Sequence, residues 1–202
     1  MRWALAGAPG PRVLDLGAGT GKLTADLAEL GGEVTAVEPD AEMLGELRRT
    51  LPEVPALEGG AEAIPLGDGS VDAVLAGNAM HWFDMDVAGP EIARVLAPGG
   101  VLAGLWNTLD DRVEWVAGLA ELSGPAAIGP RDTPASWRAE TARMHLPKAG
   151  ATRAGMLVMS EDEREALLGR IRDYLAGRPE TARGEFTLPM LTCVLRVRRA
   201  VV

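Results

Sequence analysis

The most informative stretch of the sequence is VLDLGAGTG, from Val13 to Gly21. An apolar run typical of a buried strand leads directly into three alternating glycines, and an amphipathic pattern follows from Lys22. Glycine permits a tight turn and lets a ligand approach the backbone without meeting a Cβ atom. The start of a helix offers unpaired N–H groups. The stretch therefore predicts a strand, a ligand-binding turn and a helix.

Between residues 11 and 107, short apolar runs alternate with amphipathic segments. The runs that predict strands are Arg12–Leu16, Glu33–Val37, Val54–Leu57, Val71–Ala76 and Val101–Trp106. The segments that predict helices are Lys22–Leu30 (Leu23, Leu27 and Leu30 inward), a helix capped by Asp40 (Met43, Leu44 and Leu47 inward) and Asp86–Leu96. This alternation predicts a doubly wound α/β sheet of parallel strands, with ligands beyond the carboxyl ends of those strands.

The second half of the chain is less regular. Four prolines break any long helix between residues 123 and 159. Ser160 and Glu163 resemble a capping box, which opens a helix with the apolar stripe Leu167, Leu168, Ile171 and Leu175. Thr187–Val197 predicts a final strand whose Pro189 favours an edge position. We therefore expect one domain over residues 1–202, with a core at 11–107, an irregular acceptor or lid region at about 108–159, and a completing helix and strand at 160–199.

The charge balance disfavours a nucleic-acid partner. The net charge is −9 and the isoelectric point about 4.8, whereas binding to phosphates needs a basic footprint. The basic cluster Arg196, Arg198 and Arg199 is interpreted as charges on an exposed strand edge.

Other features of the sequence limit where the protein is located and which chemistry it can perform. No apolar stretch reaches membrane-spanning length and the N-terminal residues do not resemble a signal peptide, so the sequence predicts a cytoplasmic protein. Cys193 is the single cysteine and is expected to be a small buried side chain. His81 and His145 lack metal-ligand spacing, so no metal is predicted.

Two classes of ligand could use the glycine turn, a dinucleotide or S-adenosylmethionine. Glu38 ends the second predicted strand and can accept hydrogen bonds from ribose hydroxyls, which serves either ligand. The G-A-G-T-G turn differs from the dinucleotide pattern G-x-G-x-x-G/A. Asp15 precedes the turn and can receive a cationic amino group, and Gly60-Ala61-Glu62 lies where an adenine would be met. These features favour S-adenosylmethionine.

Four motifs in order resemble the class I S-adenosylmethionine-dependent methyltransferases, in particular their small-molecule branch. The motifs are VLDLGAGTGKLT, AVEPD, GGAEAIPLGDGSVDAVLAGNAMHWFD and EIARVLAPGGVLAGLWN, within residues 11–107. The likeness is weaker at SEDEREALLGRI and FTLPMLTCVLRVRR. The resemblance implies a Rossmann-like, three-layer α/β/α fold with a mostly parallel sheet and an antiparallel last strand. It also implies methyl transfer from S-adenosyl-L-methionine to a small-molecule acceptor, with S-adenosylhomocysteine as product.

The resemblance assigns roles by position. The residues that would line the methionine and ribose portion are Asp15, Gly17, Ala18, Gly19 and Thr20, with Asn78 facing the methionine portion. Those that would hold the adenosine are Glu38 at the ribose hydroxyls, Pro39 beside the adenine, and Ala61 and Glu62 at its polar edge. Asp72 would have a structural role.

Four further residues follow the fourth and fifth predicted strands and are candidates for an acceptor pocket: His81, Trp82, Trp106 and Asn107. Methyl transfer needs an in-line nucleophile, and a base helps only when the acceptor must lose a proton. His81 is the candidate catalytic base, with a structural histidine as the alternative. For Trp82 and Trp106 the alternative is core packing.

The sequence departs from the resemblance in two places, and both leave alternatives open. The segments before the first strand and at 123–159 are short for elements that close over the cofactor and acceptor. The expectation is that a partner subunit, including a homodimer, completes the site, that the irregular segment folds over it, or that activity is weak. A protein that binds the cofactor as a scaffold without catalysis is the alternative function. A nicotinamide-dependent oxidoreductase is disfavoured by the glycine spacing and by the absence of a Tyr/Lys pair, since Tyr174 falls in the late helix.

Overall fold

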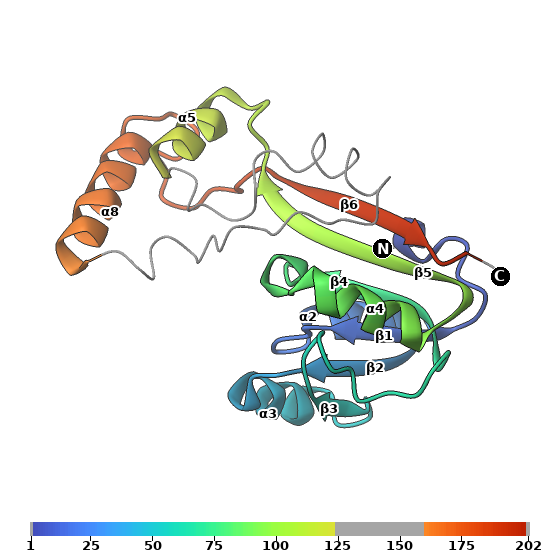
Figure 1. Ribbon diagram of the computed structural model, residues 1–202. Coiled ribbons are helices and arrows are strands. Elements are labelled where there is room, and N and C mark those ends of the chain that lie inside the picture. The colour runs from blue at the N-terminus through green and yellow to red at the C-terminus, as the bar shows by residue number, and fades with distance from the viewer. Residues whose placement is uncertain (1, 124–159, 201–202) are drawn as a thin grey trace. The chain divides into compact units, whose positions relative to one another are not determined.

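The computed structural model describes residues 2–123 and 160–200. In these residues the strands form one sheet in the order β3-β2-β1-β4-β5-β6, with an antiparallel last strand (Figure 1). The strands are β1 (Arg12–Leu16), β2 (Glu33–Glu38), β3 (Ala56–Glu58), β4 (Val71–Gly77), β5 (Leu96–Leu109) and β6 (Met190–Arg198). The helices are α1 (Arg2–Leu5), α2 (Lys22–Glu29), α3 (Ala41–Thr50), the 3₁₀ turn η1 (Met80–Trp82), α4 (Met85–Val95), α5 (Glu114–Ser123) and α8 (Glu161–Ala176).

The pairing confirms the predicted Rossmann-like sheet. Strand β1 pairs in parallel with β2 and β4, β2 with β3, and β4 with β5. The order reverses direction at β1, so β1 and β4 flank the topological switch point where ligands bind in such sheets. The described residues form two compact units. One contains residues 2–105 and 194–200, and the other contains residues 106–123 and 160–193.

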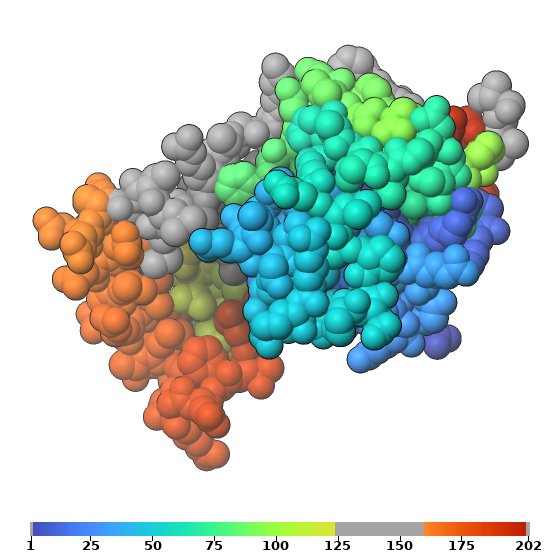
Figure 2. Space-filling view, turned by 90° about the horizontal axis from the view of Figure 1, so that it is seen from below, coloured from blue at the N-terminus to red at the C-terminus, as the bar shows by residue number. Residues whose placement is uncertain are grey.

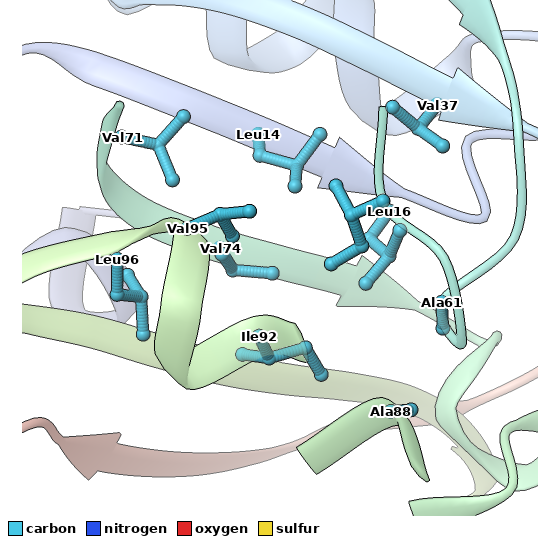
Figure 3. Packing of buried hydrophobic residues seen from close by; sticks show 11 residues of the cluster. Leu14, Leu16, Val37, Ala61, Val71, Val74, Ala88, Ile92, Val95 and Leu96 are labelled. Carbon is cyan, nitrogen blue, oxygen red and sulfur yellow. The ribbon is translucent and has the colours of Figure 1, made fainter. Parts of the chain in front are cut away.

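In the first unit the sheet is buried on both faces. Alternate residues of β1 point to opposite sides, so Leu14 and Leu16 join one core cluster while Val13 joins another. Figure 3 shows the first cluster, in which Ile92 and Val95 of α4 pack toward the strand residues. The second cluster contains Leu27 of α2 and Ala4 of α1. This arrangement gives the first unit its α/β/α layers.

Two helix faces differ from their predictions. Met43 is 47% exposed, whereas the prediction placed it in the core. Asp40 caps α3 through Glu42 N and Met43 N, and this start directs Leu44 and Leu47 inward and leaves Met43 beside the buried stripe. Helix α3 lies at the surface in Figure 2, where residues after β2 are blue to cyan. Leu30 is also exposed, because α2 ends at Glu29 ahead of the left-handed Gly31.

Three strands start at a different residue from the one predicted, and proline or glycine lies at each of these starts. The third strand starts at Ala56 rather than Val54, since Pro55 has no N–H to donate and Val54 N closes a turn onto Leu51 O. The fifth strand starts earlier than predicted, at Leu96, and a register shift opposite Val71–Ala73 absorbs the Pro98–Gly100 segment. The last strand begins at Met190, after Pro189, instead of at Thr187.

Asp72 holds the start of β4 to the start of β1. Its carboxylate accepts from Arg12 N at 3.0 Å, from Arg12 Nε at 2.9 Å and from Arg12 Nη2 at 2.8 Å. The hydrogen bond from the Arg12 side chain lowers the pKa of Asp72. These contacts lie at the strand ends opposite the glycine turn, which agrees with a structural role.

The basic cluster near the C-terminus is exposed and lies on, or directly after, the edge strand β6, as predicted, and its guanidinium groups also bind the chain itself. Arg196 donates to Trp3 O at 2.7 Å and to Ala6 O at 3.0 Å, and its guanidinium lies over the Trp3 ring at 4.3 Å. Arg198 donates to Gly7 O and Gly99 O, and Arg199 donates to Leu96 O. These guanidinium groups therefore bind backbone carbonyls of the same chain.

The second unit is built on a helix pair. The predicted capping box is confirmed, because Ser160 Oγ accepts from Glu163 N while the Glu163 carboxylate accepts from Ser160 N. The unpredicted helix α5 packs against α8 through a cluster of Trp115, Val116 and Leu119 with Ile171, Tyr174 and Leu175. Cys193 in this unit is only partly buried and lies 3.9 Å from Thr108 Oγ1, so the expectation of a buried thiol is wrong.

Replacing Gly118 with alanine is expected to destabilise the helix pair. A Cβ atom there would lie 2.1 Å from Tyr174 Oη, which donates to Trp115 O. Overpacking of this kind costs about 1–3 kcal/mol, against about 0.5–1 kcal/mol gained in helix propensity. The measurement is the free energy of unfolding in urea.

Gly169→Ala on α8 is the matched control. A Cβ atom at this position would meet nothing within 4 Å, so this variant should be more stable than the wild type by about 0.5–1 kcal/mol. Equal effects of the two substitutions would contradict the close contact at Gly118.

Candidate cofactor and acceptor site

The predicted glycine turn joins β1 to α2 in the first unit. Gly17, Gly19 and Gly21 all have positive φ, of 72°, 57° and 89°. A Cβ atom at Gly17 would lie 2.7 Å from the Ala79 side chain, so glycine lets the turn pass against the loop after β4. At Gly19 the nearest atom would be Met43 Sδ, at 3.9 Å. The turn thus leaves open space over Gly19, where a ligand can approach the backbone.

Glu38 braces this turn from the end of β2. The residue is only 6% exposed. Its Oε2 atom accepts from Gly19 N at 2.8 Å and its Oε1 atom accepts from Asp40 N at 2.9 Å. A carboxylate has about four acceptor positions, so these two bonds leave capacity for two more donors. Glu38 can hold the turn and still accept from a pair of ribose hydroxyls.

Asp15 lies fully buried in β1, just before the turn. Its Oδ2 atom accepts from Thr24 Oγ1 at 2.6 Å, while Oδ1 has no hydrogen-bond partner among the described residues. Burial raises the pKa of Asp15 to about 7, the Glu38 charge adds to this, and the Thr24 hydroxyl opposes it. A buried carboxylate oxygen without a partner is costly. A cationic ligand group would offset that cost.

The loop after β3 carries the predicted adenine contacts, Ala61 and Glu62. Ala61 is buried in the core cluster of Figure 3. Glu62 is exposed, and its Oε1 atom accepts from Asp84 N at 2.8 Å. The Glu62 side chain therefore ties this loop to the residue that precedes α4. Pro39 and Thr20, at the other loops of this edge, are both exposed.

The loop after β4 brings His81 and Trp82 together. Asn78 opens it with a φ of 53°, which is uncommon outside glycine, and donates its N–H to Leu105 O at 2.8 Å. The rings of His81 and Trp82 are 4.9 Å apart between centroids. Trp82 is 58% exposed, which excludes core packing for it. Burial lowers the pKa of His81, and its Nδ1 atom is buried without a partner in the described chain.

Trp106 and Asn107 of β5 belong to the second unit. Trp106 is 2% exposed, so its indole packs in an interior. Asn107 is exposed and its Oδ1 atom accepts from Thr192 Oγ1 at 2.9 Å. Of the four predicted pocket residues, the first unit itself brings together His81 and Trp82.

Sequence reasoning missed Met43 as a site residue. It was assigned to the core, yet it is largely exposed and is the nearest side chain to the free side of Gly19. The available signal was its place in the first turn of α3, directly after the strand end that carries Glu38.

No group of three or more His, Cys, Asp or Glu side chains suited to a metal occurs within residues 2–123 and 160–200. Helices long and apolar enough to cross a bilayer are likewise absent from this part of the chain. His145 lies outside the described residues.

Comparison with known proteins places this geometry in a family. Residues 14–104 match the model of the methyltransferase domain. An uncharacterized methyltransferase of Mycobacterium tuberculosis is 43% identical over 203 residues, which cover 94% of this chain and 84% of the relative. A demethylmenaquinone methyltransferase of Beutenbergia cavernae is 42% identical over 100 residues, 49% of this chain and 42% of that protein.

Solved structures show the same fold. The YcgJ protein of Bacillus subtilis superposes with a TM-score of 0.59 at 22% identity, over 98% of this chain and 95% of that one. A geranyl diphosphate C-methyltransferase of Streptomyces coelicolor, solved with S-adenosyl-L-homocysteine, gives 0.55 at 17% identity, over 98% and 76%. With the identity to the mycobacterial relative, these findings show that the chain belongs to the class I S-adenosylmethionine-dependent methyltransferases.

Proposed function

We propose that the protein methylates a small molecule, using S-adenosyl-L-methionine and releasing S-adenosylhomocysteine. The observation that carries the proposal is the pair of buried carboxylates around the glycine turn. Asp15 presents an oxygen without a partner, which suits a cationic amino group, and Glu38 keeps acceptor capacity for a diol. S-adenosylmethionine offers both groups, and when bound it supplies a methyl group on a positively charged sulfur.

The other cofactor contacts are proposed around these two carboxylates. Gly17, Ala18, Gly19 and Thr20 would line the methionine and ribose portion, with Asn78 on the methionine side. The adenine would lie beside Pro39, which follows Glu38 and is exposed, and beside the exposed thioether of Met43, which flanks the free side of Gly19. Ala61 and Glu62 would meet the polar edge of the adenine.

A small-molecule acceptor is favoured by charge and by the relatives. The net charge of −9 opposes binding to a phosphate backbone, and the cluster at Arg196–Arg199 is engaged with backbone carbonyls. Relatives over about half the chain carry the names demethylmenaquinone methyltransferase and malonyl-[acyl-carrier protein] O-methyltransferase.

We place the acceptor beside His81 and Trp82 of the first unit; the other two predicted pocket residues, Trp106 and Asn107, belong to the second unit. The exposed indole of Trp82 supplies a flat apolar surface against which an acceptor can be held in line with the methyl group. The lowered pKa of His81 keeps its imidazole neutral near pH 7, which is the form that accepts a proton.

The function is tested by following an isotope-labelled methyl group. The purified protein is incubated with labelled S-adenosylmethionine and separate fractions of small molecules, tRNA, DNA and protein. Label is expected in a small-molecule fraction. Label confined to a macromolecular fraction would contradict the acceptor class, and binding of S-adenosylhomocysteine without transfer to any fraction would indicate a scaffold.

His81→Gln is expected to lower the rate of methyl transfer by about 100-fold or more, in the range of general base catalysis. The affinity for S-adenosylhomocysteine should change by less than about threefold, because the proposed base acts on the acceptor. Wild-type activity should decline on acidification through the lowered pKa of His81. An active variant with the wild-type pH profile would assign His81 a structural role.

A further inference from the structure

The loop between β3 and β4 carries Ala61 and Glu62, yet it has almost no regular structure of its own. Its strand-type backbone pairing consists of an isolated antiparallel bridge between Gly60 and Ala63. A loop that contacts a ligand must nevertheless be held in one conformation to recognise that ligand. Several of the hydrogen bonds that hold this loop come from one helix, α4.

Arg94, near the end of α4, binds the loop at three points. Its Nη2 atom donates to Ile64 O at 3.0 Å and its Nη1 atom donates to Leu66 O at 2.8 Å. Nη1 also pairs with Asp68 Oδ1 at 2.8 Å. The Arg94 backbone carbonyl in turn accepts from Gly69 N at 2.9 Å. One guanidinium thus binds two carbonyls of the loop backbone, those of Ile64 and Leu66, and the side chain of Asp68.

Glu91, one turn earlier on α4, orients that guanidinium. Its two oxygens accept from Arg94 Nε and Nη2, both at 2.8 Å. The same carboxylate accepts from Ile64 N at 3.1 Å, so Ile64 is bound through both its N–H and its carbonyl. The Arg94 side chain and the Ile64 N–H lower the pKa of Glu91 to about 2, so the pair stays ionised over the working range of pH.

The other end of α4 is tied to the same loop. Asp84 caps α4 through Asp86 N, and its own N–H donates to Glu62 Oε1 at 2.8 Å. The loop segment from Glu62 to Gly69 is therefore bound at both ends of α4 (Figure 1): by Asp84, which caps the start of the helix, and by Arg94 near its end. One residue, Phe83, separates Asp84 from the proposed acceptor contacts His81 and Trp82.

We infer that Glu91 and Arg94 are a positioning pair that fixes the adenine-recognising edge at Ala61–Glu62, so that selectivity for the cofactor's base depends on these two side chains of α4. The inference rests on the proposed function, because it takes that edge to contact adenine. The pair itself does not touch the ligand. Its effect is transmitted through Ile64, which lies two residues from Glu62 and is buried in the core.

The test compares two ligands by calorimetry, S-adenosylhomocysteine and S-inosylhomocysteine, which differ in the 6-substituent of the base. The wild type should prefer the adenine compound. Arg94→Ala should lower the affinity for S-adenosylhomocysteine by about tenfold, the equivalent of about one to two hydrogen bonds. The same variant should change the affinity for S-inosylhomocysteine by less than about threefold. The preference for the adenine compound over the inosine compound should therefore fall by most of the roughly tenfold lost with S-adenosylhomocysteine. Arg94→Lys should restore part of the preference.

Arg49→Ala is the matched control. Arg49 forms the same i, i+3 pair with Glu46 on α3, at 2.6 Å, but its Nε and Nη2 atoms donate to the Glu46 carboxylate rather than to a loop backbone. This variant should keep the wild-type preference for adenine. A general loss of stability would weaken both ligands together, and melting temperatures recorded for every variant separate that effect from a loss of selectivity.

If Arg94→Ala does not fold, Glu91→Gln replaces it, because the amide releases the guanidinium while retaining the size of the side chain. An unchanged preference in the folded variant would overturn the inference. Failure of the proposed function is distinguishable, since it would appear as a wild type that does not bind S-adenosylhomocysteine or as a Glu38→Ala variant that binds it normally. A wild type that binds both ligands equally would overturn the adenine contact and with it this inference.

Discussion

Glu38→Ala is expected to reduce the affinity for S-adenosylhomocysteine by about 100-fold or more. The substitution removes the proposed acceptor of two ribose hydroxyls, and hydrogen bonds to a charged group contribute about 1.5–3 kcal/mol each. It also leaves Gly19 N and Asp40 N without their acceptors. The turn over which the ligand lies would then lose its brace. Calorimetric titration with S-adenosylhomocysteine measures the effect.

Two further variants separate the causes of this loss. Glu33→Ala changes the same type of residue at the other, exposed end of β2 and should bind like the wild type. Glu38→Gln keeps one carbonyl oxygen but replaces the other acceptor with a donor, so it should also bind weakly. Wild-type affinity in Glu38→Ala would show that the carboxylate does not meet the nucleoside.

Asp15→Asn is expected to change how the stability of the ligand-free protein depends on pH. Below the ordinary carboxyl pKa of 3.8, both the folded and the unfolded chain hold the proton. From there up to about 7 the unfolded chain has released the proton and the folded chain has not, so wild-type stability falls as pH rises. The raised pKa corresponds to a loss on the order of 4 kcal/mol at neutral pH.

The measurement is the free energy of unfolding in urea at about pH 4 and about pH 8. Asp15→Asn has no titrating group at this position, so its stability should fall less than that of the wild type over the same range. Equal slopes for the two proteins would contradict a raised pKa at Asp15.

The same substitution should weaken binding. A cationic amino group favours the ionised carboxylate, so wild-type affinity for S-adenosylhomocysteine should rise by up to about tenfold per pH unit below 7 and then level off. In Asp15→Asn this rise should disappear, and affinity at about pH 8 should be lower by about tenfold or more, because charge-assisted hydrogen bonds are the stronger ones. A pH-independent wild-type affinity would oppose an ammonium contact at Asp15.

The order of the elements could be read from the sequence because apolar periodicity and glycine positions report local constraints. The runs at Arg12–Leu16 and Val71–Ala76 became strands, and Ser160 became a helix cap. Helix α5 was not predicted because its pattern is short and lies directly before an irregular stretch, although Trp115, Val116, Leu119 and Ala120 share one buried face. The exact rotation of α3, and so the exposure of Met43, depends on tertiary packing that periodicity does not resolve.

The site could be predicted where a backbone conformation restricts the residue type. Gly17 and Gly19 have left-handed φ angles, and Glu38 ends its strand beside them. The partners of Glu62 and Arg94 could not be predicted, because they depend on which loop the sheet brings beside α4. For the same reason the acceptors of Arg196 and Arg198 could not be predicted, since they lie about 190 positions away in sequence.

The bonds from Arg196 and Arg198 to Trp3, Ala6 and Gly7 have a consequence for biosynthesis. They join residues separated by about 190 positions in sequence. During translation Trp3, Ala6 and Gly7 leave the ribosome about 190 residues ahead of these two arginines, so their carbonyl acceptors obtain these donors late. Contacts of such high sequence separation form slowly, so we expect the hydrogen bonds between this N-terminal segment and β6 to be among the late contacts of folding.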